Sequence, residues 1–212
     1  MVNEATHSRL IIAALACAAL TVALGGAVSI GIGASLDRTL LSAAALRAGR
    51  DSTALITFFQ TVSWLGDTVR RSAMVLLLAA WLLWKQRRRA ALVMMLVPTV
   101  AAITNSLLKE AFARVRPDIV PHLDSIGNLA YPSGHATNAM AFFLLVALLF
   151  ATKRPGLWRT IAVALALLVG GSRLALGVHW PSDVIGGWLW GVAFALGGWS
   201  TIRHAEARQG RG

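Results

Sequence analysis

Long apolar runs recur along this chain of 212 residues and decide what it can fold into. A helix that crosses a bilayer needs about 20 predominantly apolar residues, and residues 10–31 meet that requirement near the N-terminus. Hydrophobic residues make up 57% of the chain. Charged residues make up only 14%, well below the share of about 25% in soluble domains. The sequence therefore predicts an all-α, polytopic membrane protein.

Six segments are expected to cross the membrane as helices. They are residues 10–31, 72–84, 90–108, 136–152, 157–172 and 184–202. The second is the shortest, so the basic side chains that flank it must extend toward the bilayer surfaces. Residues 37–71 are mixed in character, and we expect an extracytoplasmic loop or a helix lying on the membrane face there. Residues 1–212 are expected to form a single domain.

The net charge of +11 would suggest a nucleic-acid partner in a soluble chain. In a membrane protein it more simply reflects topology, because cytoplasmic loops collect Lys and Arg. Six crossings put both termini on one side, together with the basic loop of residues 85–89 and the basic residues of 153–159. The termini are therefore expected in the cytoplasm. The short, basic, alanine-rich chain favours a bacterial inner membrane, with no nucleic-acid partner.

Three polar clusters remain at the opposite, extracytoplasmic ends of the predicted helices. Lys109 and Arg116 follow the third helix, and the Pro-Ser-Gly-His segment of residues 132–135 opens the fourth. Residues 172–183 run from the end of the fifth helix into the sixth and contain several ionisable side chains. Because the fourth and fifth helices lie between the two loops, both loops face the same side of the membrane.

The residues of these clusters suit an anion. Lys109, Arg116 and Arg173 would place three cations at one face, and Arg binds phosphate oxygens through paired hydrogen bonds. Ser133 and Gly134 precede an apolar helix, whose free N–H groups also favour an anion. Each cluster alone has a structural explanation as well, since basic side chains often contact lipid headgroups and a Pro-Ser-Gly-His segment can simply cap a helix.

His179 and Asp183 are four residues apart, which brings the carboxylate to the imidazole if the turn is helical. Such a pair fixes the tautomer and leaves the other ring nitrogen free to act as a nucleophile. A lone pair of this kind is more often structural, but His135 is expected at the same face. No metal site is predicted, because the surrounding cations would repel a divalent ion. The other three histidines are expected to be structural: His7, His122 and His204.

In their order and spacing, the three clusters together resemble the signature of the type 2 phosphatidic acid phosphatase (lipid phosphate phosphatase) superfamily. That signature is K-x6-R-P, then P-S-G-H, then S-R-x5-H-x3-D. The sequence fills every position between Lys109 and Asp183. The predicted layout of six helices also fits the family.

The resemblance implies a metal-independent phosphatase that needs no cofactor. His179 would attack phosphorus and form a phosphohistidine, with Asp183 orienting it and His135 protonating the leaving oxygen. The phosphoryl oxygens would be held by Lys109, Arg116, Ser133, Gly134 and Arg173. Arg114 lies outside the signature, and we expect a supporting role for it at most.

The expected substrate is a lipid phosphate or diphosphate whose tails stay in the bilayer, with undecaprenyl diphosphate as the preferred candidate. Phosphatidic acid, phosphatidylglycerol phosphate and the phosphate of lipid A are the alternatives. Soluble acid phosphatases and vanadium-dependent haloperoxidases share this site architecture, but the membrane layout argues against both. A transporter or flippase that binds lipid phosphate without hydrolysis is an alternative of another class. Such a protein would not need the pair of His179 and Asp183.

Overall fold

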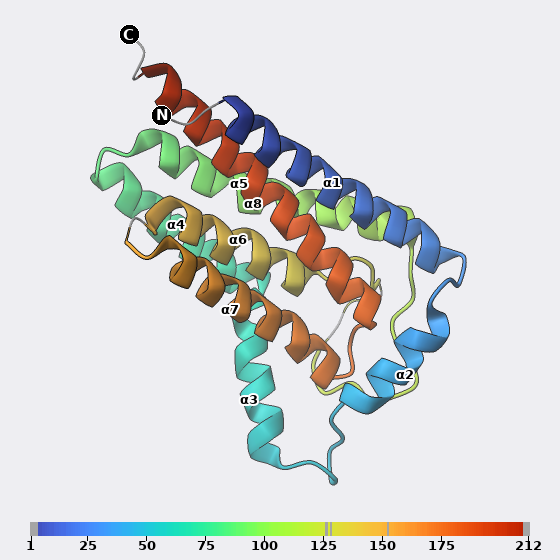
Figure 1. Cartoon of the computed structure of the whole chain (residues 1–212). Helices are drawn as coiled ribbons and strands as arrows, with labels where there is room; N and C mark the ends of the chain where they lie inside the picture. The colour runs from blue at the N-terminus through green and yellow to red at the C-terminus, as the bar shows by residue number, and fades with distance from the viewer. Residues whose placement is uncertain (1–3, 126, 128, 152, 210–212) are drawn as a thin grey trace.

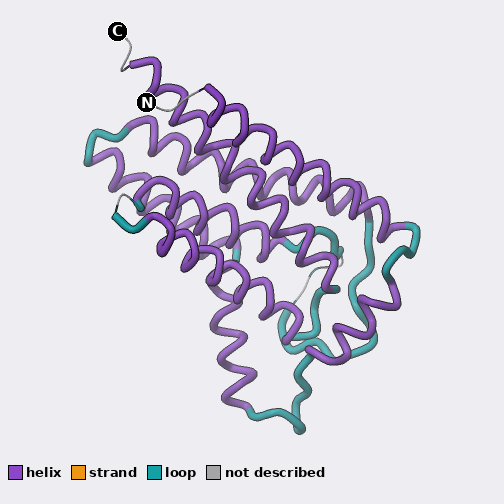
Figure 2. Tube along the Cα trace, in the orientation of Figure 1, coloured by secondary structure: helices purple, strands orange, loops and turns teal. Residues whose placement is uncertain are grey.

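The computed structural model describes residues 4–125, 127, 129–151 and 153–209. These residues form eight α-helices and a short 3-10 helix, with no strand among them (Figure 2), so the all-α fold class is confirmed. The elements are α1 (Glu4–Ser29), α2 (Ala34–Ala44), α3 (Thr53–Ser63), η1 (Trp64–Gly66), α4 (Thr68–Trp84), α5 (Arg88–Phe112), α6 (Gly134–Phe150), α7 (Pro155–Ala175) and α8 (Pro181–Gln209).

The six long helices α1 and α4 to α8 lie side by side in one bundle (Figure 1). Within it, α8 packs against α1 and α6, α6 packs against α7, and α4 packs against α5. Three of these helices, α1, α5 and α7, are long and apolar enough to cross a bilayer, and α6 is a shorter apolar helix of 17 residues. The count of six crossings stays a prediction. Residue 152, at the end of the expected fourth crossing, lies outside the described residues.

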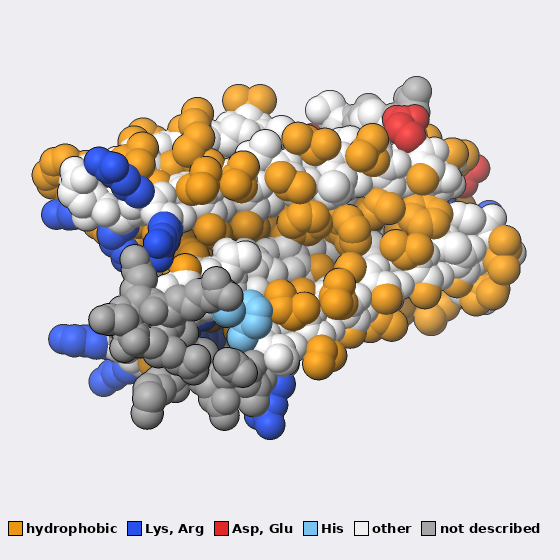
Figure 3. Space-filling model, turned by 90° about the horizontal axis from the view of Figure 1, so that it is seen from above, with side chains coloured by type: hydrophobic (Ala, Val, Ile, Leu, Met, Phe, Trp, Pro, Cys, Tyr) orange, Lys and Arg blue, Asp and Glu red, His pale blue; other side chains and the backbone are white. Residues whose placement is uncertain are grey.

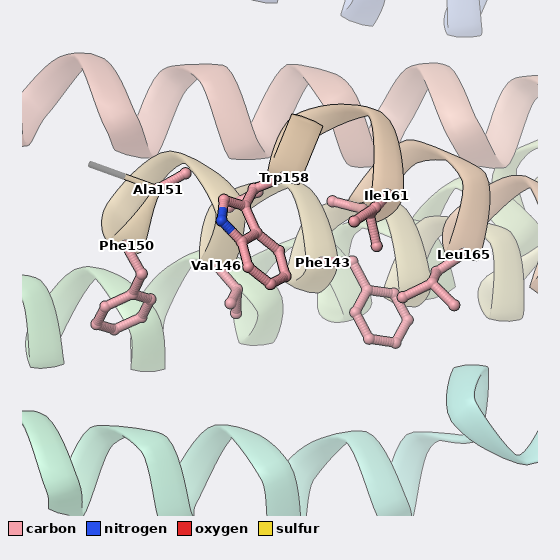
Figure 4. A pocket seen from close by; sticks show the side chains of 9 residues that line it. Phe143, Val146, Phe150, Ala151, Trp158, Ile161 and Leu165 are labelled. Carbon is pink, nitrogen blue, oxygen red and sulfur yellow. The ribbon is translucent and has the colours of Figure 1, made fainter. Parts of the chain in front are cut away.

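The flank of the bundle is apolar. Large hydrophobic side chains face outward from α1, α4, α5 and α7; Leu77, for example, is 74% exposed. Figure 3 shows these side chains spread along the bundle, with blue Lys and Arg side chains gathered mainly toward one end. A hollow of about 490 Å³ between α6 and α7 is lined by nine apolar residues (Figure 4). Soluble proteins rarely expose so much continuous apolar surface, so this flank is suited to contact with lipid.

The interior of the bundle is filled mainly by apolar side chains of α4 to α8. Val75 and Leu82 of α4 pack with Met94 of α5, Leu145 of α6 and Val169 of α7, and each is at most 4% exposed. This core holds the helices in register, and the register fixes where their ends meet.

Residues 37–71 are mostly helical, and the position of these helices at the membrane face stays a prediction. Ser52 caps α3 by accepting a hydrogen bond from the Leu55 N–H at 3.2 Å, and Asp67 caps α4 in the same way. Because of the Asp67 cap, α4 begins at Thr68, before the start expected from the apolar run. Both α2 and α3 contact α7 (Figure 1). These contacts bring residues of the N-terminal third to one end of the bundle.

Candidate active site

Four helix ends meet at the end of the bundle opposite to the start of α1 and the end of α8 (Figure 1). They are the last turns of α5 and α7 and the first turns of α6 and α8. All the site residues expected from the sequence lie on these ends or on the two loops that join them. The C-terminal end of α5 carries Lys109, and that of α7 carries Arg173.

His179 is held on both sides of its ring. The side chain is buried, and Nδ1 lies 3.3 Å from Oδ2 of Asp183 in the first turn of α8. That carboxylate oxygen also accepts a hydrogen bond from the Trp180 N–H at 2.9 Å, which holds the carboxylate next to the imidazole. With Nδ1–H facing the carboxylate, Nε2 is the acceptor of a hydrogen bond from Arg116 Nη1 at 3.1 Å. The unprotonated nitrogen therefore points toward a cation.

The surroundings of His179 keep its ring neutral. Burial lowers the pKa of His179 well below 6.5, and the nearby charges of Arg116, Lys109 and Arg173 lower the pKa further. His135 also lies close enough to contribute. Arg116, Lys109, Arg173 and His135 thus all lie near enough to His179 to act on its charge. A neutral imidazole with a free electron pair on Nε2 is a competent nucleophile.

Lys109 and Arg116 donate to backbone oxygens on the loop between α5 and α6 and on the turn before α8. Lys109 Nζ donates to the carbonyl oxygens of Leu129 and Ala130, each at 3.0 Å. Arg116 donates from Nε to the Gly127 carbonyl at 2.6 Å and from Nη1 to the Val178 carbonyl at 2.5 Å. Burial, helped by the charge of Arg173, lowers the pKa of Arg116 to about 10, so Arg116 stays protonated at neutral pH.

Arg173 has partners that sequence reasoning missed. Its side chain is almost wholly buried, and Nη1 donates to the Asp124 carboxylate and to Ser63 Oγ. Asp124 lies in the loop before α6, and Ser63 ends α3. Neither residue stands in a motif or a periodic pattern, so no signal in the sequence marked them.

The start of α6 presents donors that lack acceptors. Ser133 precedes the helix, and its hydroxyl oxygen is buried without a hydrogen-bond partner in the described part of the chain. Its backbone N–H donates to the Asp183 backbone oxygen at 2.9 Å, which ties the starts of α6 and α8 together. Gly134 is the first residue of α6, where backbone N–H groups have no partner within the helix. His135 follows, and no hydrogen bond to its ring is formed by any described residue.

Arg114 connects Asp183 to a second carboxylate, that of Asp37. Arg114 donates from Nη1 to Asp183 Oδ1 at 2.6 Å and from Nη2 to Asp37 Oδ2 at 2.7 Å. Asp37, on α2, also accepts the Ser182 N–H at 2.9 Å. Arg114 thus links the two carboxylates, and its supporting role stays a prediction. Asp37 was missed, because nothing in the sequence relates it to a residue 77 positions away.

Glycines let α8 lie directly against α6. A Cβ added at Gly187 would lie 2.5 Å from the Ser133 carbonyl oxygen, and one added at Gly191 would lie 2.6 Å from Met140 Cβ. Larger residues at these positions would push the helices apart. The close approach holds the Ser133–His135 side of the site against the His179–Asp183 side.

Residues 90–206, more than half of the chain, match the PAP2 superfamily. The chain belongs to this family. The family match includes all the residues of the predicted signature and excludes α1 to α4. It agrees with the resemblance to type 2 phosphatidic acid phosphatases found from the motifs.

Among curated PAP2 relatives, phosphatidylglycerophosphatase B of Bacillus subtilis is 41% identical over 96 residues, which cover 42% of this chain and 47% of the relative. Lipid A 1-phosphatase of Rhizobium etli is 36% identical over 109 residues, which cover 47% of this chain and 42% of the relative. The chain thus spans less than half the length of these relatives.

A solved structure is similar over almost the whole chain. It is the crystal structure of a transmembrane PAP2 type phosphatidylglycerolphosphate phosphatase from Bacillus subtilis, with a TM-score of 0.79 and 27% identity. The alignment covers 91% of this chain and 96% of that one. Together with the apolar helices, this likeness indicates a bacterial membrane protein.

Proposed function

We propose that this PAP2 protein hydrolyses a phosphate or diphosphate group from a membrane lipid, by a route that passes through a phosphohistidine and uses no metal. The observation that carries the proposal is the setting of His179. Its Nδ1 faces Asp183 and its Nε2 faces Arg116, the side chain is buried, and two further cations lie near it. Family membership and the names of the relatives support the same reaction class.

In the first step, Nε2 of His179 attacks phosphorus. A nitrogen–phosphorus bond forms while the bond from phosphorus to the lipid oxygen breaks, and His135 gives its proton to that leaving oxygen. Asp183 stabilises the positive charge that develops on the imidazole of His179. In the second step, a water molecule attacks the phosphohistidine while His135 takes up the water proton. The nitrogen–phosphorus bond then breaks and inorganic phosphate leaves.

Phosphoryl transfer is mostly a matter of position and charge neutralisation. We assign this role to Lys109, Arg116 and Arg173, together with the Ser133 hydroxyl and the Gly134 N–H at the start of α6. The unpartnered Ser133 hydroxyl supports this assignment, since a buried hydroxyl without a partner is costly unless a ligand completes it. For phosphate to bind, it must replace the loop oxygens and the Asp124 carboxylate that now contact the three cations.

We place the site on the extracytoplasmic face and the termini in the cytoplasm. The site and the start of α1 lie at opposite ends of the bundle (Figure 1). The loop between α4 and α5 and the first turn of α5, at the end away from the site, hold Lys85, Arg87, Arg88 and Arg89. Such density of Lys and Arg in a short loop favours the cytoplasmic side.

Three lipid substrates are supported by the sequence or by the names of the relatives. Undecaprenyl diphosphate is the candidate preferred from the sequence. Phosphatidylglycerol phosphate is favoured by the Bacillus relative and by the solved structure, which are both named for that activity. The lipid A relative keeps the phosphate of lipid A as a further candidate.

Phosphate release by the purified full chain, in lipid–detergent micelles with EDTA, tests the proposal. Undecaprenyl diphosphate, phosphatidylglycerol phosphate and phosphatidic acid are assayed side by side, with His179→Ala as the blank. Release that disappears in the blank supports a metal-independent lipid phosphatase, and the ratio of rates ranks the substrates. Binding of these lipids without turnover would favour the alternative of a lipid-phosphate transporter or flippase.

A further inference from the structure

Arg71 is a buried cation that the catalytic site does not use. It lies near the start of α4 and is only 4% exposed. Nη1 donates to the Pro98 carbonyl oxygen of α5 at 2.7 Å, and Nη2 lies 3.4 Å from Ser72 Oγ. Nε is buried and makes no hydrogen bond within the described residues. The side chain therefore has donor capacity that the protein leaves unfilled.

The charge of Arg71 is also unbalanced. None of the ion pairs formed among the described residues includes Arg71. A buried cation without a counter-ion is costly, and the cost rises at the positive N-terminal end of a helix. Ionisable residues within membrane segments usually mark a functional site for this reason. An anion beside Arg71 would remove the imbalance.

A cavity of about 260 Å³ opens beside Arg71 between α4 and α5. Ser72 and Thr99 line it near the guanidinium, and Leu76 and Leu96 line it farther along the same two helices. Leu76 is 59% exposed and Leu96 is 51% exposed, so the cavity is open on the lipid-facing flank of the bundle. It thus combines a cationic, hydroxyl-lined part with an apolar part that a molecule can enter from the bilayer.

We propose that this cavity binds the phosphate group of a membrane phospholipid, at a site separate from the catalytic one. The guanidinium and the two hydroxyls would hold the phosphate oxygens, because Arg binds phosphate through charge-assisted hydrogen bonds. The acyl chain would lie along Leu76 and Leu96. Free inorganic phosphate offers the same anionic chemistry, but it would leave the apolar part of the cavity unfilled.

The residues that lead into α4, just before Arg71, contact the start of α6, which carries His135. Asn138 of α6 donates from Nδ2 to the Gly66 carbonyl at 3.2 Å and faces Thr68 Oγ1 at 3.3 Å. A Cβ placed on Gly66 would lie 2.9 Å from the His135 backbone oxygen. A phospholipid held at Arg71 would therefore steady the start of α4, on which this part of α6 rests.

Native mass spectrometry of the full chain tests the site without any need for turnover. The His179→Ala variant serves as the background, and it is offered phosphatidylglycerol or phosphatidylcholine with identical acyl chains. The background protein, which keeps Arg71, should retain phosphatidylglycerol in preference to phosphatidylcholine. Arg71→Gln should lower that preference about tenfold, the effect expected for losing a charged hydrogen bond. The control is Arg70→Gln, since Arg70 is exposed and pairs with Asp67.

Thr99→Phe provides a second variant that fills the cavity and leaves Arg71 in place. It should lower retention of phosphatidylglycerol to a similar degree, so the test stands even if Arg71→Gln fails to fold. Unchanged preference for phosphatidylglycerol in a folded Arg71→Gln or Thr99→Phe protein would overturn the proposal. Displacement of the lipid by inorganic phosphate at an equal concentration would also overturn it, because the ligand would then be the free anion.

Discussion

Arg114 joins Asp183 to Asp37: its two terminal nitrogens lie 2.6 Å and 2.7 Å from the two carboxylates. Both carboxylates and the guanidinium are buried or nearly so. The first carboxylate faces His179, and the second belongs to α2, far away in the sequence. Arg114 thus links Asp37 to Asp183, and we expect Asp37 to position the proposed nucleophile through these two residues.

Replacing Asp37 with Asn should therefore slow the reaction without weakening substrate binding. The amide keeps the shape but loses the charge that holds Arg114. We expect kcat to fall roughly tenfold with little change in KM, in line with the cost of losing a charged hydrogen bond. Steady-state kinetics on a lipid phosphate measure kcat and KM separately. The matched control is Asp51→Asn, because Asp51 is an acidic residue on the loop before α3. A rise in KM alone would contradict the positioning role.

Asp124 should oppose phosphate binding, because its carboxylate occupies Arg173. Asp124→Asn would weaken that ion pair and free the guanidinium, so inorganic phosphate should inhibit at a several-fold lower concentration. Arg173→Gln should have the opposite effect. Asp118→Asn, an exposed acid on the same loop, serves as the control. Weaker inhibition in Asp124→Asn would mean that the carboxylate orients Arg173 for phosphate and does not compete with it.

The pKa of His179 is expected well below 6.5, mainly because the ring is buried and partly because of Arg116. NMR of ¹⁵N-histidine in micelles measures it, with His179→Gln identifying the signal. Arg116→Gln should raise the pKa, since a repelling charge is removed. The unfolded chain takes up a proton near pH 6.5 and the folded chain only at lower pH, so His179 contributes stability that is lost as pH falls below about 6.5. A signal that titrates near 6.5 would show that the ring is hydrated.

His135 should matter more for poor leaving groups than for good ones. An alkoxide must be protonated as it leaves, whereas p-nitrophenolate leaves without help. We expect His135→Asn to lose about 10²-fold or more activity on a lipid phosphate and much less on p-nitrophenyl phosphate. Equal losses on the two substrates would assign His135 to phosphate binding. The His179→Ala variant should lose both activities.

Gly187→Ala should destabilise the fold, because the new Cβ would meet the Ser133 carbonyl oxygen at 2.5 Å. Overpacking of this kind costs about 1–3 kcal/mol. Gly197 lies on the same helix with nothing within 4 Å of an added Cβ. Gly197→Ala should therefore leave stability unchanged or raise it slightly through helix propensity. Thermal unfolding in detergent compares the two variants, and equal melting temperatures would show that α6 and α8 separate easily.

The apolar runs and the spacing of polar residues predicted much of this molecule. Runs of apolar residues predict helices directly, and the spacing of His179 and Asp183 predicts that the two side chains meet, which they do although His179 precedes α8. The partners of Arg173 and Arg114 could not be predicted in this way. Asp124 lies in an irregular loop, and Asp37 reaches the site only through the packing of α2 against α7 and α8. Contacts between distant segments depend on the whole fold and leave no local pattern.

The reach of α2 and α3 into the site has a consequence for how such proteins diversify. Residues 90–206 carry the match to the family, yet Asp37 and Ser63, which lie before it, touch Arg114 and Arg173. Residues outside the family match thus contact two arginines of the candidate site. Substitutions there can change how Arg114 and Arg173 are held while every signature residue stays in place. Two proteins with the same signature can accordingly differ in the residues that hold these two cations.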